Sequence, residues 1–195
     1  MRTWIVIGSL VIATVMAVDA RAAESPAQWA HPITRAGLPN LARVSPTLYR
    51  GAQPEKDGLA ALPALGITTV VNLRSAHSDR PMLAGTGLRY EELPLEADGV
   101  RVEDVIRFLR LATAPWNGTV FVHCKHGADR TGVMIAAYRV VVQNWSKDEA
   151  LREMVDGGFG FHTMYTNLVQ LIRDLDVESV RRAVATNQNA LTPAR

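Results

Sequence analysis

The sequence predicts an α/β fold, in which a mainly parallel central sheet is flanked by helices, and two patterns lead to that prediction. Short runs of β-branched and aromatic residues alternate along the chain with longer segments whose apolar residues recur at helical spacing, an order typical of parallel sheets covered by helices. In addition, the run Thr119–Val122 passes through a short glycine-containing loop into the apolar segment Val133–Val142. A strand, a tight loop and a helix N-terminus together form the geometry in which backbone N–H groups converge on an anion.

The individual elements follow from local patterns. Strands are expected at residues 48–50, 67–73, 88–93 and 119–122. Helices are expected at residues 55–65, 102–113, 133–142 and 146–155, and one last helix within 161–184. Pro63 should break the first helix, and the capping box Ser146-Lys-Asp-Glu149 should begin the fourth. Residues 75–83 are expected to be part loop and part short helix. The apolar stripe of the last helix is predicted to consist of Leu168, Leu171, Ile172 and Leu175.

The chain of 195 residues is expected to hold one domain, at residues 47–185, between two terminal segments. Residues 1–22 have the pattern of a secretory signal peptide: a basic start, an apolar run shorter than a membrane span needs, and a small-residue site that predicts cleavage before Ala23. Residues 23–46 contain several prolines and are expected to be irregular, and residues 186–195 to be a disordered tail. An exported protein, periplasmic or secreted, is therefore expected; the alternative is that the apolar run is retained as a membrane anchor.

Charge and cysteine content exclude some classes of function. The net charge is +2, and no basic run alternates with aromatic residues, so nucleic acid is not an expected partner. Cys124 is the only cysteine and cannot form a disulfide within the chain. A free thiol in an oxidising compartment, inside an anion-binding loop, favours a catalytic role. Among the histidines only His123 and His126 are close in sequence, and their place on either side of Cys124 explains them better than a metal site does. No metal or cofactor is expected.

Residues 123–132 read His-Cys-Lys-His-Gly-Ala-Asp-Arg-Thr-Gly, with Cys124 and Arg130 separated by five residues. This run resembles the signature loop of the cysteine-dependent protein tyrosine and dual-specificity phosphatase superfamily. Arg50 lies in a Tyr-Arg-x-x-Gln-Pro stretch and Arg74 in an Asn-Leu-Arg stretch, and both stretches resemble those of bacterial dual-specificity-like phosphatases. The superfamily has an α/β fold with a mainly parallel sheet, which agrees with the fold predicted from the pattern.

The resemblance implies a role for each residue of the run. Cys124 would attack phosphorus and form a cysteinyl-phosphate, and Arg130 would hold two phosphate oxygens with its fork of N–H donors. Thr131 would help the thiolate to leave in the second step, while His123 would order the loop and tune the thiolate. The expected substrate-binding residues are Arg74, just past the end of a strand, and the loop residues Lys125, His126, Gly127, Ala128 and Asp129.

The proton donor for the leaving group must come from another part of the chain. The superfamily uses an aspartate on an upstream loop, and Asp98 fits best because it precedes Cys124 by 26 residues and is followed by glycine. Glu96 and Glu92 are the alternatives. Asp-Gly is also common in ordinary turns, so Asp98 has a purely structural explanation as well.

The expected substrate is a phosphate monoester, and the loop does not select one class. Lys125 and His126 place two potentially cationic groups beside the nucleophile, whereas the charge of Asp129 opposes a polyanion. Phosphorylated protein, phosphoinositide and inositol phosphate all fit as substrates. Two other functions stay open at this point: a catalytically inactive phosphate-binding module, and a rhodanese-type sulfurtransferase, which also holds a cysteine in an anion-binding loop.

Overall fold

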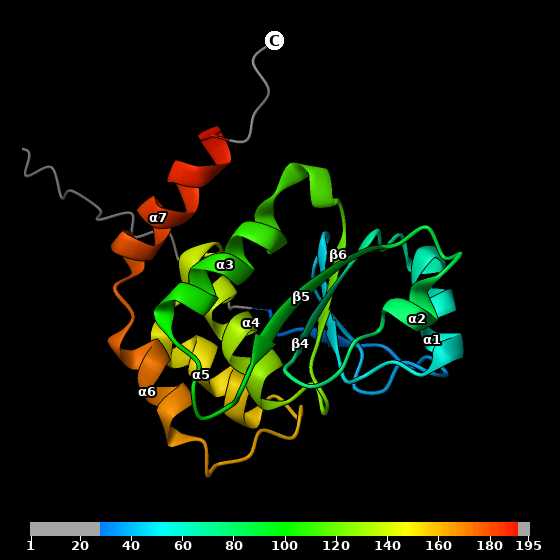
Figure 1. Ribbon diagram of the computed structural model, residues 1–195. Helices are drawn as coiled ribbons and strands as arrows, with labels where there is room; N and C mark the ends of the chain where they lie inside the picture. Colours follow the sequence, from blue (N-terminus) through cyan, green and yellow to red (C-terminus); the bar gives the residue numbers. More distant parts are fainter. Residues whose placement is uncertain (1–27, 191–195) are drawn as a thin grey trace, which may run out of the picture.

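The computed structural model describes residues 28–190, which form a six-stranded sheet with helices on both faces (Figure 1). The strands are β1 (His31–Pro32), β2 (Ala42–Ser45), β3 (Leu48–Gly51), β4 (Thr69–Arg74), β5 (Arg89–Leu95) and β6 (Val120–His123). They lie in the order β1-β2-β3-β6-β4-β5; the last four are parallel to one another, and β1 and β2 add an antiparallel edge. The predicted α/β fold with a mainly parallel sheet is confirmed.

The helices divide between the two faces of the sheet. They are α1 (Lys56–Ala61), α2 (Arg80–Leu83), α3 (Val102–Thr113), α4 (Asp129–Val141), α5 (Lys147–Asp156), α6 (Thr166–Asp174) and α7 (Val177–Ala190). In Figure 1, α3 to α7 lie on one side of the sheet, and α1 and α2 lie on the other. A hydrophobic core fills each side, and the larger of the two lies under α3 to α7. None of the helices in the described residues is both long and apolar enough to cross a lipid bilayer.

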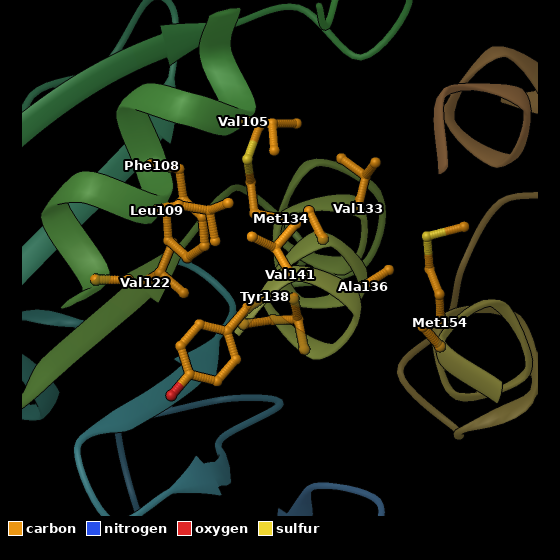
Figure 2. Close-up of a cluster of buried hydrophobic side chains, with 14 of the residues drawn as sticks. Val105, Phe108, Leu109, Val122, Val133, Met134, Ala136, Tyr138, Val141 and Met154 are labelled. Atoms are coloured by element: carbon orange, nitrogen blue, oxygen red, sulfur yellow. The ribbon is translucent and has the colours of Figure 1, made fainter. Parts of the chain in front are cut away.

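Helix α4 is the central helix of the larger core. Its residues from Thr131 to Val141 are all buried. In Figure 2, Met134 and Tyr138 of α4 face side chains of α3 and β6, including Leu109 and Val122. Because α4 is packed between the sheet and the other helices, the loop that joins β6 to α4 is held firmly at both ends.

The expectation of an irregular segment at residues 23–46 is wrong for its described part. Residues 31–32 and 42–45 form β1 and β2, which pair antiparallel with each other and with β3. The segment is also tied to α5, because the backbone N–H of Ala30 donates to Oε1 of Glu153 at 2.5 Å and Nε1 of Trp29 donates to Oε1 of Glu149 at 2.7 Å. Strands this short carry little alternation in sequence, and only their partners stabilise them.

The C-terminal region also differs from the prediction of one helix within residues 161–184. It contains two helices, α6 and α7, because Asp176 starts a new helix by accepting the backbone N–H of Ser179 at 3.0 Å. Leu168 and Leu175 of the predicted stripe are buried. Helix α7 continues to Ala190, so the predicted disordered tail does not begin at 186. The rest of that tail and the predicted signal peptide at 1–22 lie outside the described residues.

Three further boundaries matter for the site. Helix α4 begins at Asp129, so Arg130 and Thr131 lie in its first turn and not in a loop ending at Gly132 as predicted. The polar composition of that turn conceals the start of the helix. Ser146 accepts the N–H of Glu149 at 3.1 Å, as the capping box predicts. Finally, β5 continues through its proline to Leu95, which an edge strand allows because its outer N–H groups need no partner in the sheet.

Candidate active site

Residues 124–128 of the predicted signature run 123–132 form the loop, here called the signature loop, that connects β6 to the N-terminus of α4. The Cys124 side chain is buried at 2% exposure, while Lys125 and His126 are exposed. Gly127 has φ +69°, and a Cβ at this position would lie 2.5 Å from the carbonyl oxygen of Gly51. Only glycine therefore allows the loop to close against the end of β3. The loop is thereby fixed with its thiol at the N-terminus of a buried helix.

Arg50 of β3 is fully buried beside this loop. Its Nη2 donates to the carbonyl oxygen of Gly127 at 2.6 Å, and its guanidinium carbon lies 3.7 Å from the centroid of the Phe159 ring. Burial lowers the pKa of Arg50 to about 10, while the charges of Glu153 and Cys124 act in the opposite direction. Arg50 therefore stays cationic at neutral pH and favours negative charge on the loop. In the sequence, only the resemblance of its Tyr-Arg-x-x-Gln-Pro stretch to those of bacterial dual-specificity-like phosphatases drew attention to Arg50.

His123 is fully buried and bound to a carboxylate that sequence reasoning missed. Its Nε2 lies 2.8 Å from Oδ2 of Asp79, whose Oδ1 accepts Nε2 of Gln53 at 2.6 Å and whose backbone N–H donates to the hydroxyl of Tyr90 at 2.7 Å. Burial by itself would raise the pKa of Asp79. The hydrogen bond and charge of His123, together with the bond from Gln53, outweigh burial and lower that pKa below its usual value. Asp79 fixes the orientation of the His123 ring, which suits a residue that orders the loop.

The lowered pKa of Asp79 makes the stability of the fold depend on acid pH. A carboxyl group that is more acidic in the folded state contributes stability above its unfolded pKa, near 3.8, and this contribution is lost as the pH falls through the folded pKa. We expect the free energy of unfolding to decrease below about pH 4, and to decrease less steeply in Asp79→Asn. Urea unfolding followed by circular dichroism in this range measures both slopes. The exposed Asp57→Asn is the control, and an Asp79→Asn slope as steep as that of the wild type would contradict the prediction.

Arg74 lies at the end of β4 as predicted, but its guanidinium contacts another side chain and not the loop. Its Nη1 donates to Oε1 of Gln53 at 2.9 Å, and the backbone N–H of Gln53 donates to the carbonyl oxygen of Lys125 at 3.2 Å. Arg74 is thus connected to the loop through Gln53. Its direct contact with a substrate stays a prediction.

Two further residues that sequence reasoning missed hold the rim of the loop. Asn40, in the connection between β1 and β2, donates from Nδ2 to the carbonyl oxygens of His126 and Phe159, each at 3.0 Å. Its φ of +54° lies in the left-handed region that asparagine tolerates. His162, in the connection between α5 and α6, donates its backbone N–H to Oδ1 of Asp129 at 2.9 Å, and its Nδ1 lies 2.9 Å from Oδ2.

Arg130 lines a cavity of about 450 Å³ that also contains the predicted acid. The lining residues are Glu96, Ala97, Asp98, Arg130, Met164, Tyr165 and Asn167. Nη1 of Arg130 donates to the carbonyl oxygen of Leu95 at 2.9 Å, and Nδ2 of Asn167 donates to the carbonyl oxygen of Ala97 at 2.9 Å. The end of β5 and the loop that follows it are thereby anchored by side chains of α4 and α6.

The three candidate acids separate in space. Asp98 and Glu96 are exposed and line the same cavity as Arg130. Glu92 does not line it, and accepts the hydroxyl of Ser78 at 2.5 Å. The geometry keeps Asp98 and Glu96 as candidates and removes the local support for Glu92.

Thr131, in the first turn of α4, is fully buried, and its hydroxyl has no hydrogen-bond partner within residues 28–190.

Residues 38–170 match the family model described as a DSP-PTPase phosphatase fused to NAD+ kinase. The chain is also 40% identical over 173 residues to the dual specificity protein phosphatase TpbA of Pseudomonas aeruginosa. This alignment covers 88% of this chain and 78% of TpbA. The chain belongs to the dual-specificity phosphatase family. The resemblance carried by residues 123–132 is confirmed, and this dual-specificity phosphatase uses a cysteine-based mechanism to hydrolyse phosphate monoesters. Relatives that are phosphatases favour hydrolysis over the sulfurtransferase and inactive-module alternatives.

Solved structures of two other phosphatases are similar to this chain. The crystal structure of P. aeruginosa TpbA superposes with a TM-score of 0.73 at 41% identity and covers 83% of this chain and 98% of its own. A TpbA variant in complex with phosphotyrosine has the same TM-score at 40% identity. The catalytic domain of Siw14, a PP-IP phosphatase from S. cerevisiae, has a TM-score of 0.69 at 21% identity, covers 82% of this chain and 98% of its own, and shares the fold.

Proposed function

We propose that this enzyme hydrolyses phosphotyrosine-type monoesters by attack of the Cys124 thiolate on phosphorus. The observation that carries the proposal is the position of this buried thiol, in a loop closed by Gly127 at the N-terminus of α4 and next to the buried cation of Arg50. Backbone N–H groups of the loop would hold the phosphate oxygens, and Arg130 would exchange its bond to Leu95 for two bonds to the phosphate.

The reaction would proceed in two balanced steps. The S–P bond forms as the bond from phosphorus to the leaving oxygen breaks, and that oxygen takes a proton from Asp98. Water then attacks phosphorus, gives its proton back to the carboxylate of Asp98, and releases inorganic phosphate and the thiolate. The buried hydroxyl of Thr131, which has no partner among the described residues, would be free to donate a hydrogen bond to the departing sulfur.

The cavity beside Arg130 supports an aryl phosphate as substrate. Tyr165 is half-buried and Met164 is 77% exposed, so both add aromatic or apolar surface next to a guanidinium. The volume of about 450 Å³ lies within the range of small-ligand sites. A TpbA variant, which is similar to this chain, has been crystallised with phosphotyrosine, and this agrees with an aryl phosphate as substrate.

Inositol phosphates are a second candidate class. The inositol diphosphatase DSP5 of Arabidopsis thaliana is 27% identical over 125 residues, which is 59% of this chain and 60% of DSP5. Lys125 and His126 are exposed on the loop, where they would meet additional phosphate groups. Asp129, whose charge would oppose a polyanion, already accepts the backbone N–H of His162.

A substrate panel separates the two classes. We expect the highest kcat/KM for phosphotyrosine peptides, compared with phosphoserine peptides, phosphoinositides, inositol polyphosphates and inositol pyrophosphates. Lys125→Ala should lower kcat/KM for polyphosphates much more than for phosphotyrosine peptides, because only the former carry phosphate groups beyond the one in the loop. A preference for inositol phosphates would assign the second class, and no release of phosphate from any substrate would refute the proposal.

Asp98→Asn should change turnover in a way that depends on the leaving group. We expect a loss of about 10²- to 10⁴-fold for an alkyl phosphate, whose leaving oxygen needs a proton, and a small loss for p-nitrophenyl phosphate, whose leaving group does not. Steady-state kinetics on both substrates measure the difference, with Glu96→Gln as the matched control. If Glu96→Gln shows the leaving-group dependence, Glu96 is the acid. Equal losses on both substrates in Asp98→Asn would speak against a proton donor at that position.

We also propose that the enzyme works outside the cytoplasm. The support is compositional: a basic start, an apolar run and a small-residue site within residues 1–22. N-terminal sequencing of the protein recovered from a periplasmic or culture fraction should begin at Ala23. A protein that keeps Met1 and stays in the cytoplasmic fraction would contradict the proposal.

A further inference from the structure

Three potential metal ligands gather at the rim of the signature loop, and the phosphatase mechanism does not use them as a group. They are His126 of the loop, Asp129 at the start of α4, and His162 between α5 and α6, and their ligand atoms all lie within 4.8 Å of one another. The ring centroids of the two histidines are 5.7 Å apart at an interplanar angle of 60°. Both histidines are exposed, so an ion has access from solvent.

We propose that His126, Asp129 and His162 bind a divalent first-row transition metal ion, for which zinc is the best fit. Two imidazoles and one carboxylate form a ligand set typical of zinc, whereas magnesium and calcium prefer oxygen ligands alone. The sequence did not predict this site, because His162 lies 36 residues beyond His126 and has no ligand spacing to the other histidines.

The distances permit coordination after small movements. Zinc bonds of about 2.0–2.2 Å in a tetrahedral site place neighbouring ligand atoms about 3.3 Å apart. Nδ1 of His162 and Oδ2 of Asp129 are 2.9 Å apart, so this pair needs to open by only a few tenths of an ångström. His126 must close at most about 1.5 Å, which rotation of an exposed side chain achieves.

The surroundings already orient most of the ligands. The backbone N–H of His162 holds Oδ1 of Asp129 at 2.9 Å, which leaves Oδ2 beside the His162 ring. Asn40 fixes the backbone of His126 by donating to its carbonyl oxygen at 3.0 Å. Hydrogen bonds of this kind orient metal ligands and raise affinity. The side chain of His126 is therefore the main group that binding must order.

Three protein ligands leave the fourth position of a tetrahedral ion open to water or to an oxygen of a phosphate group. The ion would also join the signature loop and the start of α4 to the connection between α5 and α6, whose Met164 and Tyr165 line the cavity beside Arg130. Metal availability would then act on the enzyme at this rim without taking part in phosphoryl transfer.

Zinc titration against a chromophoric chelator, with cobalt as a spectroscopic probe, tests the site in the mature enzyme. We expect one ion per chain, binding at least about tenfold weaker in His126→Ala, His162→Ala and Asp129→Asn, and unchanged in the exposed His31→Ala. Circular dichroism verifies that each variant is folded, and His126→Gln replaces His126→Ala if that variant is not.

Cys124→Ser separates this site from metal binding by the nucleophile, and it should bind zinc as tightly as the wild type. Loss of binding in Cys124→Ser, or a cobalt–thiolate charge-transfer band in the wild type, would place the metal on Cys124 and overturn the proposal. Undiminished binding in both histidine variants would overturn it as well. Because binding is the readout, the result does not depend on which phosphate ester the enzyme hydrolyses.

Discussion

Cys124→Ser is expected to lower phosphate release by at least about 10⁴-fold, because a serine hydroxyl stays protonated where the thiol supplies the attacking anion. Serine is close in size to cysteine, and Cys124 is the only cysteine of the chain, so no disulfide is lost. The melting temperature should therefore change little. Initial rates with p-nitrophenyl phosphate and a phosphotyrosine peptide measure the loss.

Two measurements make this result specific to the proposed nucleophile. Intact mass of acid-quenched enzyme should show a phosphoryl adduct on the wild type during turnover and none on Cys124→Ser. Calorimetry should show that Cys124→Ser still binds a phosphotyrosine peptide, because the backbone N–H groups and Arg130 are retained. Turnover that survives in Cys124→Ser would refute covalent catalysis by this residue.

Glu153→Gln is expected to destabilise the fold by about 3–5 kcal/mol, because it leaves the guanidinium of Arg139 buried without a counter-charge. Both residues are 1% exposed, and Nε and Nη2 of Arg139 donate to the carboxylate oxygens of Glu153 at 2.7 and 2.6 Å. Arg139 also donates to the carbonyl oxygen of Val44 at 3.1 Å, so the pair links α4, α5 and β2. Urea unfolding measures the loss.

Two variants control this prediction. Arg152→Gln removes an exposed ion pair with Glu149 and should have a much smaller effect. The double variant Arg139→Met/Glu153→Leu removes both buried charges and should recover most of the stability that Glu153→Gln loses. A loss in Glu153→Gln no larger than in Arg152→Gln would contradict the prediction.

The features that could be predicted from the sequence are those with a local signal. The buried strand at 67–73, the helix at 102–113 and the cap at Ser146 each follow from neighbouring residues, and the structure contains all three within a few residues. Cys124 and Arg130 were recognisable because their spacing and the loop residues between them lie in one short run. Asp98 was a candidate because of its distance upstream of Cys124, and it lines a cavity with Arg130, while its role as the acid stays a prediction.

The features that escaped prediction depend on contacts between distant residues. The bond between His123 and Asp79 joins residues 44 positions apart, and that between Asp129 and His162 spans 33 positions. Arg50 was visible only as part of a stretch that resembles those of bacterial dual-specificity-like phosphatases, because nothing in the neighbouring residues shows that it binds the carbonyl oxygen of Gly127. The break between α6 and α7 needed the cap at Asp176, which an unbroken apolar stripe conceals.

The anchoring of the N-terminal segment to α5 has a consequence for the order of folding. β1 is the first strand to leave the ribosome, yet the neighbouring Ala30 finds its partner Glu153 only 123 residues later, and Trp29 finds Glu149 after 120. Contacts of such long range form late, because the chain between them must first be ordered. The segment that precedes β1 therefore cannot dock on the body of the domain until α5 has been synthesised. We expect this docking to be among the last steps of folding.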